Sequence, residues 1–324
     1  MMSRRGCVLA AVLAAAAILA VWSFFGGWYS AGPLEKDGNF IVPNGASLSA
    51  VAERLEEKGI VRSAGGFSFR ARIFGGGGGI KAGEFAIPAH ASPSQVLSII
   101  TSDDVIRRFV TVPEGMPSIM VQERLMAIPQ LTGDVAAPDE GSVLPDSYAY
   151  DAGETRQEVL RRMQAAMSRT LQEQWAKRDP NLVVKTPEEA LILASIVEKE
   201  TGKPQERRMV AGLYSNRLKQ GMLLQADPTI IYPLTKGKPL GRRIRQSEIQ
   251  AVNDYNTYTM VGLPKHPITN PGRASIEAVL HPAKTDAVYM VADGTGGHAF
   301  ASTLAEHNAN VAKWFAIRRE RGEL

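Results

Sequence analysis

The longest apolar run in the chain lies near its beginning, and it constrains the fold more than any other feature. Of the nineteen residues 7–25, only Ser23 is polar. At a helical rise of about 1.5 Å per residue the run is about 28 Å long, close to the ~30 Å hydrocarbon core of a bilayer. The sequence therefore predicts a membrane anchor over residues 1–28, and no second run approaches that length.

Charges on either side of the run predict its orientation. Arg4 and Arg5 precede it and no lysine or arginine follows closely, so the positive-inside rule places the N-terminus in the cytoplasm and the rest of the chain outside. A cleaved signal peptide is the competing interpretation, because small residues follow at 30–32. An uncleaved anchor is favoured, since the run exceeds the roughly 7–15 residues of a signal core.

Composition limits what the part beyond the anchor can do. Cys7 is the only cysteine, so no internal disulfide and no thiolate metal site is expected there. The chain has 37 basic and 33 acidic residues, and without Arg4 and Arg5 the balance is 35 against 33. Such a balance gives no reason to expect a nucleic-acid partner. The five histidines are never three or four residues apart, and we expect neither a metal nor a cofactor.

Local patterns divide the exported part in two. Residues 29–39 are polar and rich in glycine and charge, as expected of a tether. Residues 40–104 predict a small unit of strand, helix, strand and helix, whose second helix begins at a capping box formed by Ser92 and Gln95. Residues 105–324 make up a larger segment. This mixture of helices and short strands predicts an α+β fold.

The most informative stretch is a helix predicted over residues 187–200. Thr186 supplies an N-cap, and Pro187 occupies the first helical position. Residues 190–197 are apolar on nearly every face, and Gly202 stands where a helix should end. The pattern is typical of a buried central helix.

Glu200 ends this helix and continues its apolar stripe through Val197 and Leu193. Partial burial and the negative end of the helix dipole should raise the pKa of this carboxyl, as a general acid requires. The sequence leaves an alternative open, in which Glu200 pairs with Lys203 or Arg207 at the surface.

Two later segments have the composition of a sugar-binding groove. Residues 225–232 and 255–258 interleave amides, hydroxyls and aromatic rings, which stack on sugar rings and bond their hydroxyl groups. The short signatures of serine hydrolases, penicillin-binding enzymes and zinc proteases do not occur in the sequence.

A set of short motifs runs from residue 195 almost to the C-terminus. They are SIVEKET (195–201), YSNRL (214–218), LQADPTIIY (224–232), YNTY (255–258), GLP (262–264), NPG (270–272), HPAKT (281–285), VADGTGGHAF (291–300) and HN (307–308). Together they resemble the endolytic murein transglycosylases of the MltG or YceG-like type. A looser match covers the anchor, a LysM-like unit at 40–104 and a stretch at 112–148. Lys265 and His266 depart from the family pattern after GLP.

The resemblance implies a single-pass bacterial enzyme anchored in the inner membrane, with a periplasmic catalytic domain at 105–324. Such an enzyme cuts nascent peptidoglycan strands internally between MurNAc and GlcNAc, leaves 1,6-anhydroMurNAc ends and so terminates elongation. The motifs place the catalytic acid at Glu200. The groove residues that they imply are Asn216, Gln225, Asp227, Tyr255 and Asn256. The implied partners are glycan strands and the membrane, with peptidoglycan synthases or division proteins as candidates.

Two alternatives remain open at this point. A conventional glycoside hydrolase on the same substrate would need a second carboxylate, for which Asp227 and Asp293 are the candidates. A non-catalytic murein-binding scaffold would act through the LysM-like unit. The intact E-K-E motif at 198–200 favours catalysis over the scaffold, and product chemistry separates the lyase from the hydrolase.

Overall fold

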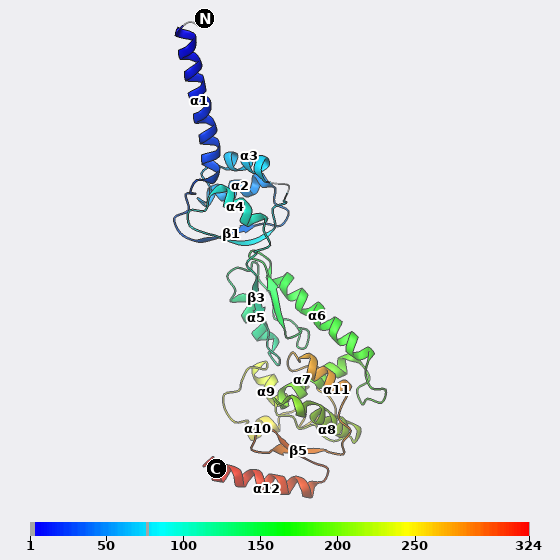
Figure 1. Cartoon of the computed structure of the whole chain (residues 1–324). Coiled ribbons are helices and arrows are strands. Elements are labelled where there is room, and N and C mark those ends of the chain that lie inside the picture. The colour runs from blue at the N-terminus through cyan, green and yellow to red at the C-terminus, as the bar shows by residue number, and fades with distance from the viewer. Residues whose placement is uncertain (1–3, 76–77, 324) are drawn as a thin grey trace. The chain divides into compact units, whose positions relative to one another are not determined.

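A computed structural model describes residues 4–75 and 78–323, without the side chains of residues 4–11, 17, 20, 22 and 23. The chain divides into two compact units, residues 1–108 and 109–324 (Figure 1). The division falls four residues beyond the boundary expected at 104/105. The described part is a mixed α+β fold whose strands form two-stranded sheets.

The first unit encloses its core between an antiparallel pair of strands and three short helices. Its elements are α1 (Arg4–Tyr29), β1 (Gly38–Val42), α2 (Leu48–Glu57), α3 (Ala64–Phe74), β2 (Gly83–Ile87) and α4 (Pro93–Thr101). Strands β1 and β2 run antiparallel, with Phe40 opposite Phe85, and both rings are buried. Ser92 and Gln95 form the expected capping box at the start of α4.

Helix α3 is the element that sequence reasoning missed in this unit. Two glycines, Gly65 and Gly66, stand in its first turn and lower its helix propensity, which hid it. The Ser63 hydroxyl caps the helix by accepting from the Gly66 amide at 3.2 Å. Phe67 and Ala71 face the core of the unit. The observed order is therefore β1, α2, α3, β2 and α4.

The described end of α1 packs on this unit. Trp28 is buried, with its ring 5.9 Å from that of Phe67, and Arg70 donates to the Phe24 carbonyl at 3.1 Å. Among the residues that the structure describes, no helix combines the length and apolarity needed to cross a membrane. Several side chains of the apolar run at 7–25 are not among those described, and the anchor expected over residues 1–28 stays a prediction.

The segment expected as a tether, residues 29–39, is bonded to the first unit. The Gly32 amide donates to the His90 carbonyl, and the His90 amide donates to the Leu34 carbonyl. A Cβ at Gly32 would lie 2.2 Å from the Ala91 carbonyl oxygen, so only glycine permits this close approach.

The second unit is built around helix α7 (Pro187–Glu200), at the residues predicted from the sequence. The Thr186 hydroxyl accepts from the Glu189 amide at 3.1 Å, which is the expected N-cap. The other elements are β3 (Arg108–Thr111), α5 (Ser118–Met126), β4 (Ser147–Tyr150), α6 (Arg156–Ala176), η1 (Pro204–Glu206), α8 (Arg207–Lys219), α9 (Pro228–Thr235), α10 (Gln246–Ile249), α11 (Arg273–Leu280), β5 (Tyr289–Ala292), β6 (His298–Ala301) and α12 (Leu304–Glu320).

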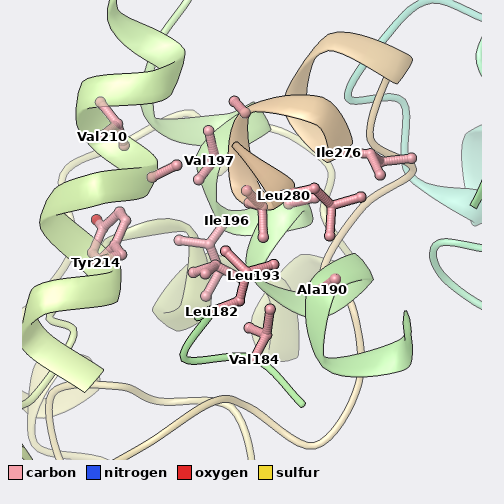
Figure 2. Packing of buried hydrophobic residues seen from close by; sticks show 14 of the residues in the cluster. Leu182, Val184, Ala190, Leu193, Ile196, Val197, Val210, Tyr214, Ile276 and Leu280 are labelled. Atoms are coloured by element: carbon pink, nitrogen blue, oxygen red, sulfur yellow. The ribbon is translucent and has the colours of Figure 1, made fainter. Parts of the chain in front are cut away.

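Helices α7, α8 and α11 meet in the core of this unit. Figure 2 shows Leu193, Ile196 and Val197 of α7 between Tyr214 of α8 and Leu280 of α11. All are almost fully buried. Burying a side chain of this size stabilises the fold by about 1.5–3 kcal/mol, so the core holds the C-terminal end of α7, and with it Glu200, in a fixed position.

Candidate active site

Glu200 is the last residue of α7, and its carboxyl lies inside the protein. Burial is the main reason why the pKa of Glu200 is raised to about 7. A hydrogen bond from the Tyr214 hydroxyl works in the opposite direction, and so does the positive charge of Arg217. The negative charge of Asp227 raises the pKa further. The carboxyl is therefore largely protonated below neutral pH, as expected from the apolar stripe.

One oxygen of this carboxyl lacks a hydrogen-bond partner among the described residues. This oxygen, Oε1 of Glu200, is buried. The surface ion pair considered from the sequence is wrong, because both cations have other partners. Arg207 bonds Glu114 at 3.0 Å, and Lys203 donates to the Thr295 hydroxyl at 2.8 Å. A buried polar atom without a partner is costly in a stable fold, and a catalytic role is one of the reasons for which such an atom is kept.

Glu200 lies on the wall of a pocket of about 510 Å³. The lining comes from α7, α8, the loop 224–227, Tyr258, β5, His298 and the start of α12. Polar groups and tyrosine rings line the pocket together with a few aliphatic side chains. This mixture can stack on a sugar ring and bond its hydroxyl groups.

Asp227 brings a second carboxylate to this pocket. Its Oδ1 accepts from the Tyr258 hydroxyl at 2.6 Å, which fixes the side chain at the start of α9. Two residues earlier, Gln225 has a φ of 52°, a left-handed conformation that is costly for a residue other than glycine. The main-chain N–H of Gln225 donates to the Thr257 carbonyl at 3.0 Å, and this bond holds the strained loop against residues 255–258.

Arg217 is a buried cation beside the pocket that sequence reasoning did not single out. Its guanidinium donates to the main-chain carbonyls of Val288 at 2.6 Å and Leu224 at 2.7 Å. It thereby joins α8 to the residue before β5 and to the loop at 224–227, and both β5 and this loop line the pocket. Arg217 belongs to the YSNRL motif, so the motif pointed to this residue. Nothing in the sequence indicated the distant carbonyls that it bonds.

A carboxylate–imidazole pair borders the same pocket. Nδ1 of His298 lies 2.8 Å from Oε2 of Glu206, and the Glu206 carboxylate also accepts from the His298 amide. Glu206 thereby fixes the orientation of the imidazole, and His298 is one of the residues that line the pocket. The sequence offered His298 within the motif at 291–300 but gave no reason to join it to Glu206.

Of the groove residues expected from the resemblance, Gln225 and Asp227 lie with Glu200 on one pocket. The Asn216 amide donates to the carbonyls of Thr285 and Ala287, at 2.7 and 3.1 Å. Tyr255 lines a different pocket, together with Tyr232.

Asn256 is fully buried and serves the main chain. Its amide nitrogen donates to the carbonyls of Ile249 at 2.9 Å and Ala251 at 2.7 Å, and its oxygen accepts from the Tyr258 amide. The side chain thereby ties the end of α10 to the loop that carries Tyr258.

Glu198, two residues before the candidate acid, has a different environment. Its Oε2 accepts from the Gly272 amide at 2.9 Å, and its Oε1 lies 3.8 Å from Arg207. A Cβ at Gly272 would lie 2.0 Å from a carboxylate oxygen of Glu114, so a larger residue here would displace that side chain. Glu198 therefore holds the NPG segment at 270–272.

The fold and the site together define an α+β enzyme that carries one buried, protonatable glutamate in a polar, aromatic-lined pocket. Across the described residues, no group of three or more His, Cys, Asp or Glu side chains has the arrangement of a metal site. The chain belongs to the YceG-like family, whose model matches residues 40–313.

Relatives of known name are similar over most of the chain. A protein of Bacillus subtilis (strain 168) named endolytic murein transglycosylase is 28% identical, over 89% of this chain and 89% of that protein. A protein of the same name from Streptococcus pneumoniae serotype 2 (strain D39 / NCTC 7466) is 26% identical, over 84% of this chain and 57% of that protein. The crystal structure of a putative YceG-like protein from Listeria monocytogenes has the same fold, with a TM-score of 0.54 and 24% identity over 85% of this chain and 98% of that chain.

Proposed function

We propose that the protein is an endolytic murein transglycosylase that cleaves peptidoglycan strands between MurNAc and GlcNAc and leaves 1,6-anhydroMurNAc ends. The relatives carry this name, and the family model spans most of the chain. The observation that carries the proposal in this molecule is Glu200, a carboxyl of raised pKa with one buried, unpartnered oxygen, on the wall of a pocket large enough for a sugar.

A single carboxyl suffices for the reaction. Protonated Glu200 gives its proton to the glycosidic oxygen as the bond from that oxygen to C1 of MurNAc breaks. The 6-hydroxyl of the same sugar attacks C1, and its proton passes to the Glu200 carboxylate. No water is consumed, and the acid is restored for the next cycle. Tyr214, which bonds the carboxyl, holds it in position through both transfers.

Asp227 has an electrostatic part in this scheme. Its negative charge adds to the effect of burial in keeping the proton on Glu200, and it favours the positive charge that develops at C1 as the bond breaks. The bond from Tyr258 holds the carboxylate in place for this purpose.

Hydrolysis is the second candidate, and one observation keeps it open. Asp227 lines the same pocket as Glu200, as a water-activating carboxylate would have to. Asp293 does not line this pocket, and both of its oxygens accept hydrogen bonds within its own turn, from the main-chain amides of Thr295 and Gly297 and from the Thr295 hydroxyl.

Product analysis of the full chain tests the proposal. Purified uncrosslinked strands are incubated with the wild-type protein and with Glu200→Gln, which keeps the shape of the side chain but cannot donate an acidic proton. We expect the wild type to give anhydro ends, lighter than reducing ends by one water, and the variant to give no cleavage. Reducing ends would establish the hydrolase instead. No cleavage by the folded wild type would leave the scaffold as the function.

We also infer a place for the protein in the cell envelope. The apolar run at 7–25 and the arginines before it support an inner-membrane anchor with the N-terminus in the cytoplasm and both units in the periplasm. A reporter fused after residue 324 should be active only when that end is periplasmic. Cytoplasmic activity of the fusion would overturn the orientation.

The first unit is a candidate murein-binding module within the same proposal. The LysM-like resemblance at 40–104 supports this role, and the unit has a hydrophobic core of its own. Deleting residues 40–104 should weaken binding to strands and leave slow cleavage of concentrated strands, because the acid lies elsewhere. Unchanged strand affinity in the deletion variant would remove this module from the proposal. Peptidoglycan synthases and division proteins remain the candidate protein partners.

A further inference from the structure

A second pocket, of about 670 Å³, lies in the same unit and shares no lining residue with the pocket of Glu200. It is bounded by the start of α5, the loop 137–140, the second half of α9, Tyr255 and residues 266–267. The mechanism proposed above uses none of its side chains, although the pocket is larger than the one that holds the acid.

Two tyrosine rings form one wall of this pocket. The ring centroids of Tyr232 and Tyr255 lie 4.9 Å apart at an interplanar angle of 50°. Both side chains are half-buried, and burial is the main cause that raises the pKa of each hydroxyl, so both stay protonated. The Tyr232 hydroxyl donates to that of Tyr255, which leaves the Tyr255 proton for a ligand. A pair of rings with such hydroxyl groups presents apolar faces beside polar groups, which suits the mixed surface of a sugar.

Polar groups of three kinds complete the lining. Both oxygens of Glu140 accept from the Ser118 amide, at 3.0 and 3.1 Å, and burial raises the pKa of this carboxyl to about 7. Lys236 is exposed, lines the pocket and ends α9 with a φ of 54°, a strained left-handed conformation. His266 adds an imidazole. The pocket therefore offers acceptors and donors around its aromatic wall.

The same two elements join this pocket to the active site. Asp227, at the start of α9, lines the first pocket, whereas Tyr232 and Lys236 further along α9 line the second. In the loop 255–258, Tyr258 lines the first pocket and Tyr255 the second. Helix α9 has eight residues and is about 12 Å long. A ligand that occupies both pockets must therefore be longer than one sugar ring.

We propose that the second pocket is a distal saccharide subsite, which binds a sugar of the same strand at a distance from the bond that Glu200 cleaves. The inference rests on the proposed function and extends it. A contact far from the cleaved bond holds a strand that continues past the active site, so strands long enough to reach the subsite bind more tightly than short ones.

Binding of strands of defined length to the full chain tests this subsite. In a Glu200→Gln background, where strands are not cut, Tyr232→Leu should weaken binding of long strands about tenfold and leave that of short strands unchanged. Tyr232→Phe keeps the ring and should bind long strands nearly as the parent does. Lys236→Asn, which the left-handed backbone tolerates, should weaken the same long strands severalfold.

Phe109→Leu is the matched control, because Phe109 is 57% exposed and lines neither pocket. Thermal unfolding shows whether each variant keeps the fold. An equal loss for strands of every length, or no loss in either Tyr232→Leu or Lys236→Asn, would overturn the subsite. Cleavage by the wild type is scored separately: if it cuts no strand, the proposed reaction fails, while the binding series still decides whether this pocket holds a saccharide.

Discussion

The hydroxyl of Tyr258 donates a hydrogen bond to Oδ1 of Asp227 over 2.6 Å, and this bond fixes the only other carboxylate among the described residues that line the pocket of Glu200. A fixed negative charge beside a buried acid favours the protonated acid. The pair therefore ties the geometry of the loop 255–258 to the protonation state of the catalytic group.

The pH dependence of cleavage should report this coupling. The pKa of Glu200 is about 7, so single-turnover cleavage by the wild type should fall as the pH rises through 7 and the acid loses its proton. In Asp227→Asn the charge that raises this pKa is gone, and the falling limb should move to lower pH. The maximal rate should also drop by about tenfold, because one electrostatic contact to the transition state is lost.

Asp254→Asn is the matched control for this profile. Asp254 is 66% exposed and pairs with Lys265 outside the pocket. Loss of its charge should therefore change neither the pH at which cleavage falls nor the maximal rate. If the cleavage rate of Asp227→Asn fell at the same pH as that of the wild type, the electrostatic role of Asp227 would be contradicted.

Glu200→Gln should stabilise the protein at alkaline pH. The carboxyl has a pKa of about 7 in the folded state against an ordinary glutamate value of 4.5 in the unfolded chain, so the folded state binds more protons between these two values. The free energy of unfolding of the wild type therefore falls as the pH rises through this window, by at most about 3 kcal/mol. The glutamine variant has no such loss.

Denaturant unfolding of both proteins at acidic and alkaline pH measures this difference. The two proteins should have equal stability below about pH 4.5, and the variant should be the more stable one above pH 7. Because Glu140 titrates near the same pH in both proteins, only the difference between them reports on Glu200. A variant less stable than the wild type at alkaline pH would mean that the carboxyl is not buried as the structure has it.

Glu198→Gln separates the two acids of the E-K-E motif. Glu198 bonds the Gly272 amide and lies near Arg207, so its neutralisation should cost about 1–2 kcal/mol of unfolding free energy. Cleavage per folded molecule should stay close to that of the wild type. The exposed Glu173 on α6 gives the control variant Glu173→Gln, which should change neither quantity. Loss of cleavage in fully folded Glu198→Gln would place Glu198 in the chemistry.

The parts of the fold that the sequence predicted are those decided by neighbouring residues. Helix α7 is determined by signals that lie within fifteen residues of one another: the N-cap Thr186, Pro187 and an apolar stripe. The same stripe places Glu200 inside the protein. Helix α3 escaped because its glycines oppose a helix locally, and its packing overrides them. Local signals thus located the acid and its helix.

The rest of the site depends on contacts between distant residues. Glu206 and His298 are 92 positions apart, and no pattern at either residue indicates the other. Composition also does not distinguish an amide that faces a pocket from one that bonds the main chain. Gln225 and Asn256 were both expected in the groove, but only Gln225 lines the pocket. That distinction needs the tertiary structure.

A pair of substitutions can separate these two amides in solution. Asn256→Ala removes donors to the carbonyls of Ile249 and Ala251 in a buried place, so the free energy of unfolding should fall by about 3 kcal/mol. Gln225→Asn shortens an exposed side chain at a left-handed backbone that asparagine tolerates better, so stability should hold or rise slightly. Its KM for strands should rise severalfold, because the longer amide reaches the substrate. Denaturant unfolding and steady-state cleavage measure both effects, and a stable Asn256→Ala protein with a raised KM would return Asn256 to the groove.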